Sequence, residues 1–158
     1  NFVSQHTNLT AYLILKQTAK FLYLLLLLLI YSNSNAITIS VNSVCSNPSQ
    51  SYNFDSYDYT PDFIIKISSY SLNPDFVFKE VSNKDDADIV IEDNGDNGDM
   101  VVCKSKKGRT IKLLNYEYGA DLIVTISDYS YSPDYTIFHN SKIISLKEAI
   151  AIYSTTRL

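Results

Sequence analysis

The chain has 158 residues, of which 46% are hydrophobic and 19% are charged, with 13 tyrosines and no tryptophan. This length favours one globular domain, and the presence of only 4 glycines and 4 prolines excludes collagen-like and linker-like chains. Residues 1–36 hold two lysines and no acid, so the remaining chain holds 11 basic and 17 acidic residues, a net charge of −6. Such a surface repels a phosphate backbone, which argues against nucleic acid as a partner.

The N-terminal segment has the layout of a secretory signal peptide. Lys16 and Lys20 precede the uncharged residues 21–31, and small polar residues ending in Ala36 follow. The apolar core is shorter than the roughly 20 residues that cross a bilayer. We expect cleavage after Ala36 and a secreted or periplasmic protein. The alternative is an uncleaved anchor, with membrane contact only through this segment.

The segment after the signal peptide begins with an apolar–polar alternation at residues 37–41, which predicts a half-buried strand. Residues 46–60 are polar and rich in tyrosine, as in a connector. We therefore divide the chain into a signal peptide or anchor at 1–36, a strand and connector at 37–60, a β-repeat domain at 61–144, and a C-terminal helix and tail at 145–158.

An internal repeat organises the chain from residue 61 onward. Its units open at positions 61, 74, 87, 98, 109, 120 and 133, in steps of 11 or 13 residues, and follow the pattern Y-x-x-x-[AP]-D-h-h-h-x-h with h apolar. Each unit holds one short strand, rich in β-branched and aromatic residues, and one polar turn. Three adjacent apolar residues place bulk on both faces of a strand, which predicts a two-layer or closed arrangement. The fold class is therefore all-β, with about seven short strands.

The repeated acidic positions are Asp62, Asp75, Asp88, Asp99, Asp121 and Asp134. We expect each carboxylate to accept a hydrogen bond from the backbone N–H two residues further on. A column of carboxylates binding calcium is the alternative. Residues 93–99 are its best local candidate, but they lack the EF-hand register and the glycine-rich repeat of calcium-binding β-rolls.

Tyrosine also recurs in register, four residues before the Ala or Pro, at Tyr57, Tyr70, Tyr116 and Tyr129. This register favours a structural role in the repeat. The alternative is a ligand platform, because tyrosine combines apolar area with one polar group.

The two cysteines, Cys45 and Cys103, both follow the proposed cleavage site, so they could pair in an oxidising compartment. A buried free thiol at Cys103 is the other interpretation. Cys103 with His139 could form a thiolate pair, which is the least favoured functional hypothesis. No metal-ligand spacing and no catalytic motif is present, so we expect no enzyme activity, no catalytic or metal-binding residue and no cofactor.

The tail predicts a short helix over residues 146–153. Ser145 and Glu148 match a capping box, and Leu146, Ala149, Ile150 and Tyr153 share one helical face. We expect that face to pack on the sheet.

The combination of these repeats with a signal peptide resembles the bacterial septoil-knot domain family. The matching stretches are residues 57–62, 70–75, 116–121 and 129–134, with Ala87-Asp88 as a partial copy, and the resemblance covers about 61–140. It implies a small all-β domain wound into a seven-crossing torus knot, without catalytic residues or an established activity. Two units depart from the pattern, because Arg109-Thr110 lacks the acid and Gly98 replaces Ala or Pro.

The leading functional hypothesis is thus an exported, non-enzymatic binding or structural module whose partner the sequence does not identify. A calcium- or ligand-binding module that uses the repeated aspartates is the second hypothesis, and a thiol-dependent enzyme is the third.

Overall fold

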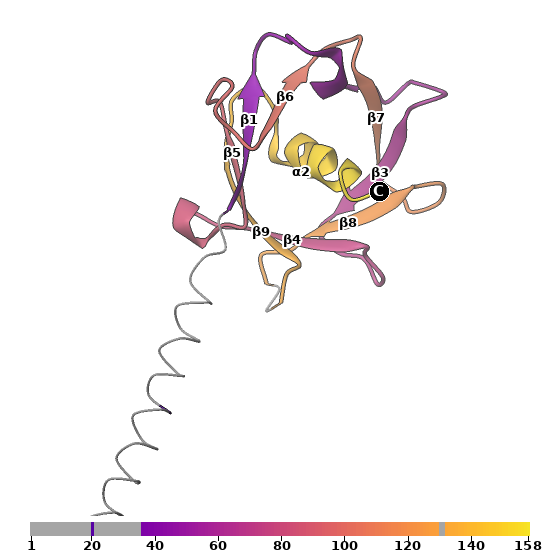
Figure 1. Ribbon diagram of the computed structural model, residues 1–158. Helices are drawn as coiled ribbons and strands as arrows, with labels where there is room; N and C mark the ends of the chain where they lie inside the picture. Colours follow the sequence, from indigo (N-terminus) through magenta and orange to yellow (C-terminus); the bar gives the residue numbers. More distant parts are fainter. Residues whose placement is uncertain (1–19, 21–35, 130–131) are drawn as a thin grey trace, which may run out of the picture. The chain divides into compact units, whose positions relative to one another are not determined.

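The computed structural model describes residues 20, 36–129 and 132–158, and strands between Ile37 and Asn140 form a closed barrel of nine. Around the ring the order is β1-β5-β9-β4-β8-β3-β7-β2-β6, and every neighbouring pair is parallel (Figure 1). The strands are β1 (Ile37–Asn42), β2 (Ser51–Phe54), β3 (Phe63–Ser68), β4 (Phe76–Glu80), β5 (Ile89–Glu92), β6 (Met100–Lys104), β7 (Arg109–Leu114), β8 (Leu122–Ile126) and β9 (Tyr135–Asn140). Two 3-10 turns, η1 (Pro48–Gln50) and η2 (Lys84–Asp86), and the helix α2 (Leu146–Thr155) complete the described elements.

The all-β prediction and the closed arrangement are confirmed, but the number of strands was wrong. The barrel has nine strands rather than about seven. One extra strand is β1, which the sequence predicted as a separate N-terminal strand, and the other is β2, which lies inside the expected connector. β2 was missed because its four residues, SYNF, lie within a polar, tyrosine-rich stretch and are too few to give a clear periodic signal.

Helix α2 lies inside the barrel and fills it (Figure 1). Its residues 149–155 are all buried, and several of them share one core with inward-facing strand residues such as Phe78, Ile65 and Ile137. The predicted helix, its capping box at Ser145 and Glu148 and its packing on the sheet are present, but the sheet surrounds the helix, so burial is not confined to the predicted face. A helix enclosed by a barrel is buried all round, so it must be largely apolar on every side.

The chain winds around the barrel almost twice. Each strand lies two places from the preceding one in the ring, with a strand from the other circuit between them; β3 and β4, for example, flank β8. Strands of the second circuit therefore fill the gaps that the first circuit leaves. Neighbouring strands are far apart in sequence, as in the pairing of Phe63 with Ile111.

The register explains how such short turns can join parallel strands, which ordinarily need a crossover of about a dozen residues or more. Ile67 in β3 and Phe76 in β4 both pair with Val124 of the strand between them. Phe54 in β2 and Phe63 in β3 likewise both pair with Ile111. Each strand thus begins at the level where its predecessor ends, and a turn has only to step over one strand.

The turns make this step on the outer side of the barrel. A Cβ at Gly98 would lie 2.5 Å from the Ser40 hydroxyl oxygen and 2.8 Å from the Ser40 nitrogen, so this turn touches β1. A Cβ at Gly108 would lie 2.4 Å from the carbonyl carbon of Ser51 in β2. Only glycine fits at these two crossings, which is why Gly98 replaces the Ala or Pro of the other units.

The repeated aspartates form hydrogen bonds with the strands that their turns cross rather than within their own turns. Each carboxylate accepts a hydrogen bond from a backbone N–H of the strand that its turn crosses, and not from the N–H two residues further on. The pairs are Asp62–Thr110, Asp75–Ile123, Asp88–Thr136, Asp99–Thr38, Asp121–Ile64 and Asp134–Val77, at 2.7–2.8 Å. The expected local hydrogen bond is therefore wrong, because the crossed strand supplies the donor.

The irregular unit near residue 109 is explained by the same register. Arg109 pairs with Tyr52 of β2, the strand crossed here, as Phe63 pairs with Ile111 of β7. Arg109 therefore occupies the position after the aspartate, and Gly108, whose Cβ would meet Ser51, occupies the position of the aspartate itself. The Arg109 guanidinium donates to the Tyr52 hydroxyl at 2.8 Å. The unit therefore opens at Lys107-Gly108 instead of Arg109-Thr110.

Apart from Lys20 and Ala36, the proposed signal peptide lies outside the described residues. Among the residues that the structure describes, no helix has the length and apolar character needed to cross a membrane.

Candidate functional site: an arc of exposed tyrosines

Four turns on neighbouring strands carry exposed aromatic side chains. The turns at 55–62, 115–121, 69–75 and 127–134 cross β7, β3, β8 and β4, which follow one another in the ring. We call the described residues of these turns the tyrosine arc. Its exposed apolar side chains, with their exposed fractions, are Tyr57 (85%), Tyr59 (97%), Tyr70 (70%), Leu72 (80%), Tyr116 (61%), Tyr118 (90%) and Tyr129 (89%).

Hydrogen bonds from or to a side chain two residues earlier fix the backbone at three of the repeated tyrosines. The Tyr57 N–H donates to Asp55 Oδ1 at 2.8 Å, and the Tyr129 N–H donates to Ser127 Oγ at 3.3 Å. The Ser68 hydroxyl donates to the Tyr70 carbonyl at 2.7 Å. The register of these tyrosines is thus set by their main chain, and the rings do not hold the barrel together. The side chains of Tyr57, Tyr70, Tyr116 and Tyr129 are exposed, and their structural role in the repeat stays a prediction.

Two lysines on the outer face of the barrel form hydrogen bonds with turns of the arc. Lys66 Nζ lies 2.6 Å from Glu117 Oε1, and the Ser71 hydroxyl donates to the same oxygen at 2.9 Å, which joins two turns of the arc. The hydrogen bond from Lys66 is the main reason that the pKa of Glu117 lies below its usual value. Lys112 Nζ donates to the Asp58 carbonyl at 2.9 Å. These lysines were not predicted from the sequence, although each lies two residues after the residue whose N–H binds a repeated aspartate.

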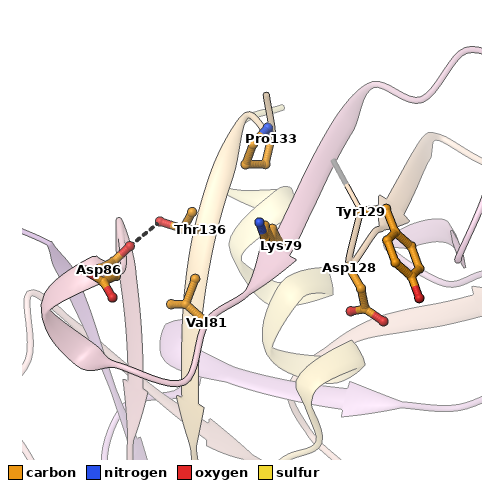
Figure 2. Close-up of a pocket in the computed structure, with 7 residues that line it drawn as sticks. All are labelled: Lys79, Val81, Asp86, Asp128, Tyr129, Pro133 and Thr136. Carbon is orange, nitrogen blue, oxygen red and sulfur yellow. Dashed lines mark hydrogen bonds between the residues drawn. The ribbon is translucent and has the colours of Figure 1, made fainter. Parts of the chain in front are cut away.

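An open hollow of about 470 Å³ lies beside the arc (Figure 2). Lys79, Asp86 and Asp128 provide its charged groups, and Thr136 donates a hydrogen bond to the Asp86 carbonyl at 2.9 Å. Asp128 also borders two further hollows, one of which reaches Lys147 at the start of α2. The hollows are therefore open surface depressions around Asp128 rather than an enclosed ligand pocket.

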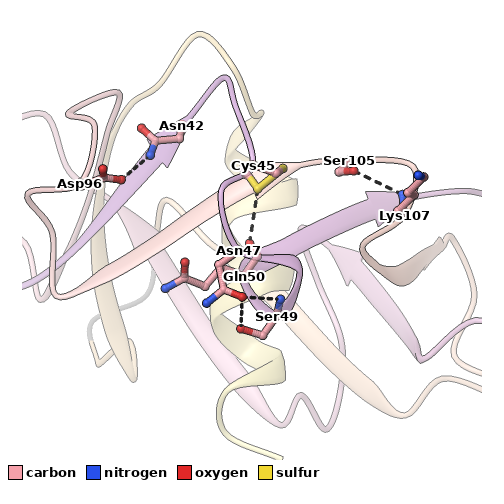
Figure 3. Close-up of a disulfide and its surroundings, with 9 residues drawn as sticks. Asn42, Cys45, Asn47, Ser49, Gln50, Asp96, Ser105 and Lys107 are labelled. Carbon is pink, nitrogen blue, oxygen red and sulfur yellow. Dashed lines mark hydrogen bonds between the residues drawn. A yellow bond between two sulfur atoms is a disulfide. The ribbon is translucent and has the colours of Figure 1, made fainter.

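Cys45 and Cys103 are joined by a disulfide, with their Cα atoms 5.4 Å apart (Figure 3). The bridge ties the turn after β1 to the end of β6, so Cys103 has no thiol to offer as a nucleophile. His139 Nε2 lies 3.0 Å from the carbonyl of Ile144. Since a carbonyl only accepts, Nε2 carries the proton and the ring has a structural hydrogen bond.

The acidic stretch at 93–99 does not converge on a common point. Asp93 accepts from Ser141 and Lys142, Asp96 from the Asn42 amide at 2.7 Å, and Asp99 from the Thr38 N–H. Gly95 has a φ of 63°, which fits a tight turn. Within the described part of the chain, no group of three His, Cys, Asp or Glu side chains is placed to hold a metal ion.

Comparison of the chain with known proteins finds no matching protein-family model, no matching curated protein and no matching solved structure.

Proposed function

We propose that this chain is an exported, non-enzymatic binding module that presents the tyrosine arc to a partner. The exposure of the arc carries this proposal: six tyrosines and Leu72 are 61–97% exposed on four neighbouring turns. Tyrosine is enriched at protein interfaces, and contiguous exposed aromatic surface marks interaction sites in soluble proteins. A barrel that fixes the backbone of the turns also lowers the entropy lost on binding.

The chemistry of the other candidate residues supports a binding role over an enzymatic one. Cys103 is bonded to Cys45, which removes the nucleophile that the thiol hypothesis needs. The six repeated aspartates accept N–H groups of crossed strands, and these bonds explain the recurrence of the acid without a calcium ion. Helix α2 occupies the space in which a barrel of this size could hold a ligand.

Export is the second part of the proposal. The basic flank, the apolar run and the small residues before Ala36 support secretion or a periplasmic location, with membrane anchoring as the alternative. A disulfide is also typical of proteins outside the reducing cytosol. The intact mass of protein recovered from an exporting bacterial host tests this: a chain beginning at Ile37 supports export, and a retained, membrane-bound full chain contradicts it.

The winding supports membership of the septoil-knot family as a further part of the proposal. The chain circles the ring almost twice, with the second circuit between the strands of the first, and such a winding is compatible with a torus knot. Joining the ends of the folded chain covalently and then unfolding it tests the knot. A knotted circle stays more compact than an unknotted circle of the same length.

The binding function is tested with an array of peptides and glycans of varied charge. We compare the wild-type protein with a variant that carries Tyr57→Ser, Tyr59→Ser, Tyr116→Ser and Tyr118→Ser, called here the four-tyrosine variant. Val44→Ser is the matched control, because Val44 is 74% exposed on a turn outside the arc. The proposal expects at least one ligand class to bind the wild type and the control but not the variant. Equal binding by all three proteins would contradict it.

A further inference from the structure

We propose that the partner of the tyrosine arc is a cationic protein segment that carries arginine or lysine side chains along an extended chain. This inference rests on the binding function proposed above and adds the chemistry of the partner. The arc combines two features that recognise such a segment: exposed aromatic rings and acidic groups that lack a basic counterpart.

Charge is distributed unevenly among the turns. The four turns of the arc contain eight Asp or Glu residues and no Lys or Arg. The other four turns between strands, at 43–50, 81–88, 93–99 and 105–108, contain six acids, three lysines and no tyrosine. All tyrosines in turns therefore lie on the side of the barrel where the turns carry no positive charge.

The acids of the arc are largely uncompensated. The described residues form three ion pairs, and only the pair between Lys66 and Glu117 involves the arc. Most of the other arc carboxylates accept backbone N–H groups, as Asp58 does from Thr60 and Asp134 does from Val77. Because a backbone N–H group is uncharged, these hydrogen bonds do not neutralise the carboxylates. Counting the three lysines of the strands below, at positions 66, 79 and 112, against the eight acids, the arc keeps a net charge of −5.

Acids and tyrosines alternate within the arc. Asp58 stands between Tyr57 and Tyr59, and Asp128 directly precedes Tyr129. Glu117 stands between Tyr116 and Tyr118 but already pairs with Lys66, so Asp58 and Asp128 are the carboxylates open to a partner. A guanidinium or ammonium group can lie over a tyrosine ring while it pairs with the adjacent carboxylate, which combines a cation–π contact with an ionic hydrogen bond.

The protein uses the same contact internally. The Arg109 guanidinium lies 4.9 Å from the centre of the Tyr52 ring, and the Arg157 guanidinium lies 5.0 Å from that of Tyr153. Among the described rings of the arc no such cation is present, and Tyr59 and Tyr118 are 97% and 90% exposed.

The negative charge of the arc also favours a cationic segment over a neutral polysaccharide. A sugar ring would stack on the tyrosines, but it would gain no ionic attraction from the carboxylates and would displace their water. A cationic segment gains from both features and is attracted to the arc before contact.

The test measures binding of a short peptide in which arginine alternates with glycine. Its counterpart with glutamine in place of arginine, and a cello-oligosaccharide, serve as the other probes. The wild type, the four-tyrosine variant, the Val44→Ser control and an Asp58→Asn/Asp128→Asn variant are titrated with each probe at two salt concentrations. The amide oxygen that the first of these substitutions introduces can still accept the Thr60 N–H, so the double variant removes charge without removing that turn.

We expect the wild type and the control to prefer the arginine peptide to the glutamine peptide. The four-tyrosine variant should weaken arginine-peptide binding about tenfold, the effect of two exposed cation–π contacts. The Asp58→Asn/Asp128→Asn variant should bind more weakly and with a smaller salt dependence.

Equal affinity of the wild type and the four-tyrosine variant for the arginine peptide would overturn the inference, since net charge alone would then explain binding. Tyrosine-dependent binding of the cello-oligosaccharide without the arginine peptide would also overturn it, but would leave the binding function intact. Failure to bind either probe overturns this partner class, and the array then decides the binding function separately.

Discussion

Asp75 and Ile123, 48 residues apart, are joined by two reciprocal hydrogen bonds. The Asp75 N–H donates to the Ile123 carbonyl at 2.7 Å, and the Ile123 N–H donates to Asp75 Oδ2 at 2.8 Å. The same arrangement recurs at three further crossings, in the pairs Asp88–Thr136, Asp121–Ile64 and Asp134–Val77. In each of these units the aspartate thus hydrogen-bonds the turn to the strand of the other circuit that the turn crosses.

Removal of the Asp75 carboxylate should destabilise the barrel. Asp75→Ala leaves the Ile123 N–H without its acceptor, and we expect a loss of about 1–3 kcal/mol in the free energy of unfolding. Asp75→Asn keeps an oxygen acceptor and should cost less. Urea unfolding measures both, with Asp85→Ala in an exposed turn as the control. A loss at Asp75 no larger than at Asp85 would show that the hydrogen bond contributes nothing.

Gly98→Ala should destabilise the protein because the crossing has no room for a side chain. The new Cβ would lie 2.8 Å from both the Ser40 nitrogen and the Thr38 carbonyl oxygen. These are backbone atoms that cannot rotate away, so we expect a loss of about 2 kcal/mol or more. Adding Ser40→Ala should not restore stability. Gly119→Ala is the comparison: Gly119 has a φ of 78° and no atom within 4 Å, so only backbone strain of about 1 kcal/mol applies. Equal thermal stability of the two single variants would contradict the close approach.

Loss of the Cys45–Cys103 bridge should lower stability by about 3 kcal/mol, because it links residues 58 apart and restricts the unfolded chain. Cys45→Ser/Cys103→Ser is compared with the wild type in urea, with and without reductant. Reductant should lower the midpoint of the wild type and leave the double variant unchanged. If reductant had no effect on the wild type, the bridge would not be formed in solution.

Glu148 should make stability depend on pH in the acid range. Burial of the carboxylate raises its pKa, but hydrogen bonds from Lys104 and Ser145 outweigh burial, so the pKa lies below the usual 4.5. A lowered folded-state pKa stabilises the protein above pH 4.5, and this contribution is lost as the pH falls through the folded-state value. Glu148→Gln should therefore lose stability at neutral pH and show a flatter melting-temperature profile in acid. Parallel profiles for the two proteins would contradict this role.

The local features of this protein can be predicted from its sequence. The period of 11 or 13 residues marked most strands, and Ser145 with Glu148 marked the start of α2. These features depend on neighbours in sequence, so they can be read from it. The repeated aspartates were located in the same way, but their role was not.

Which strands pair with one another depends on the three-dimensional path of the chain and could not be predicted from the sequence. The partner of Asp75 lies 48 residues away, and nothing in the repeat distinguishes that strand from the others. The same holds for the parallel order of the ring, the place of α2 inside it, and the glycine at the Ser40 crossing. The exposure of the tyrosines also depends on this path, because a ring in a turn is buried or free according to the path of a distant segment. The candidate site therefore exists only because the winding of the chain brings its turns together, although each of its residues can be located in the sequence.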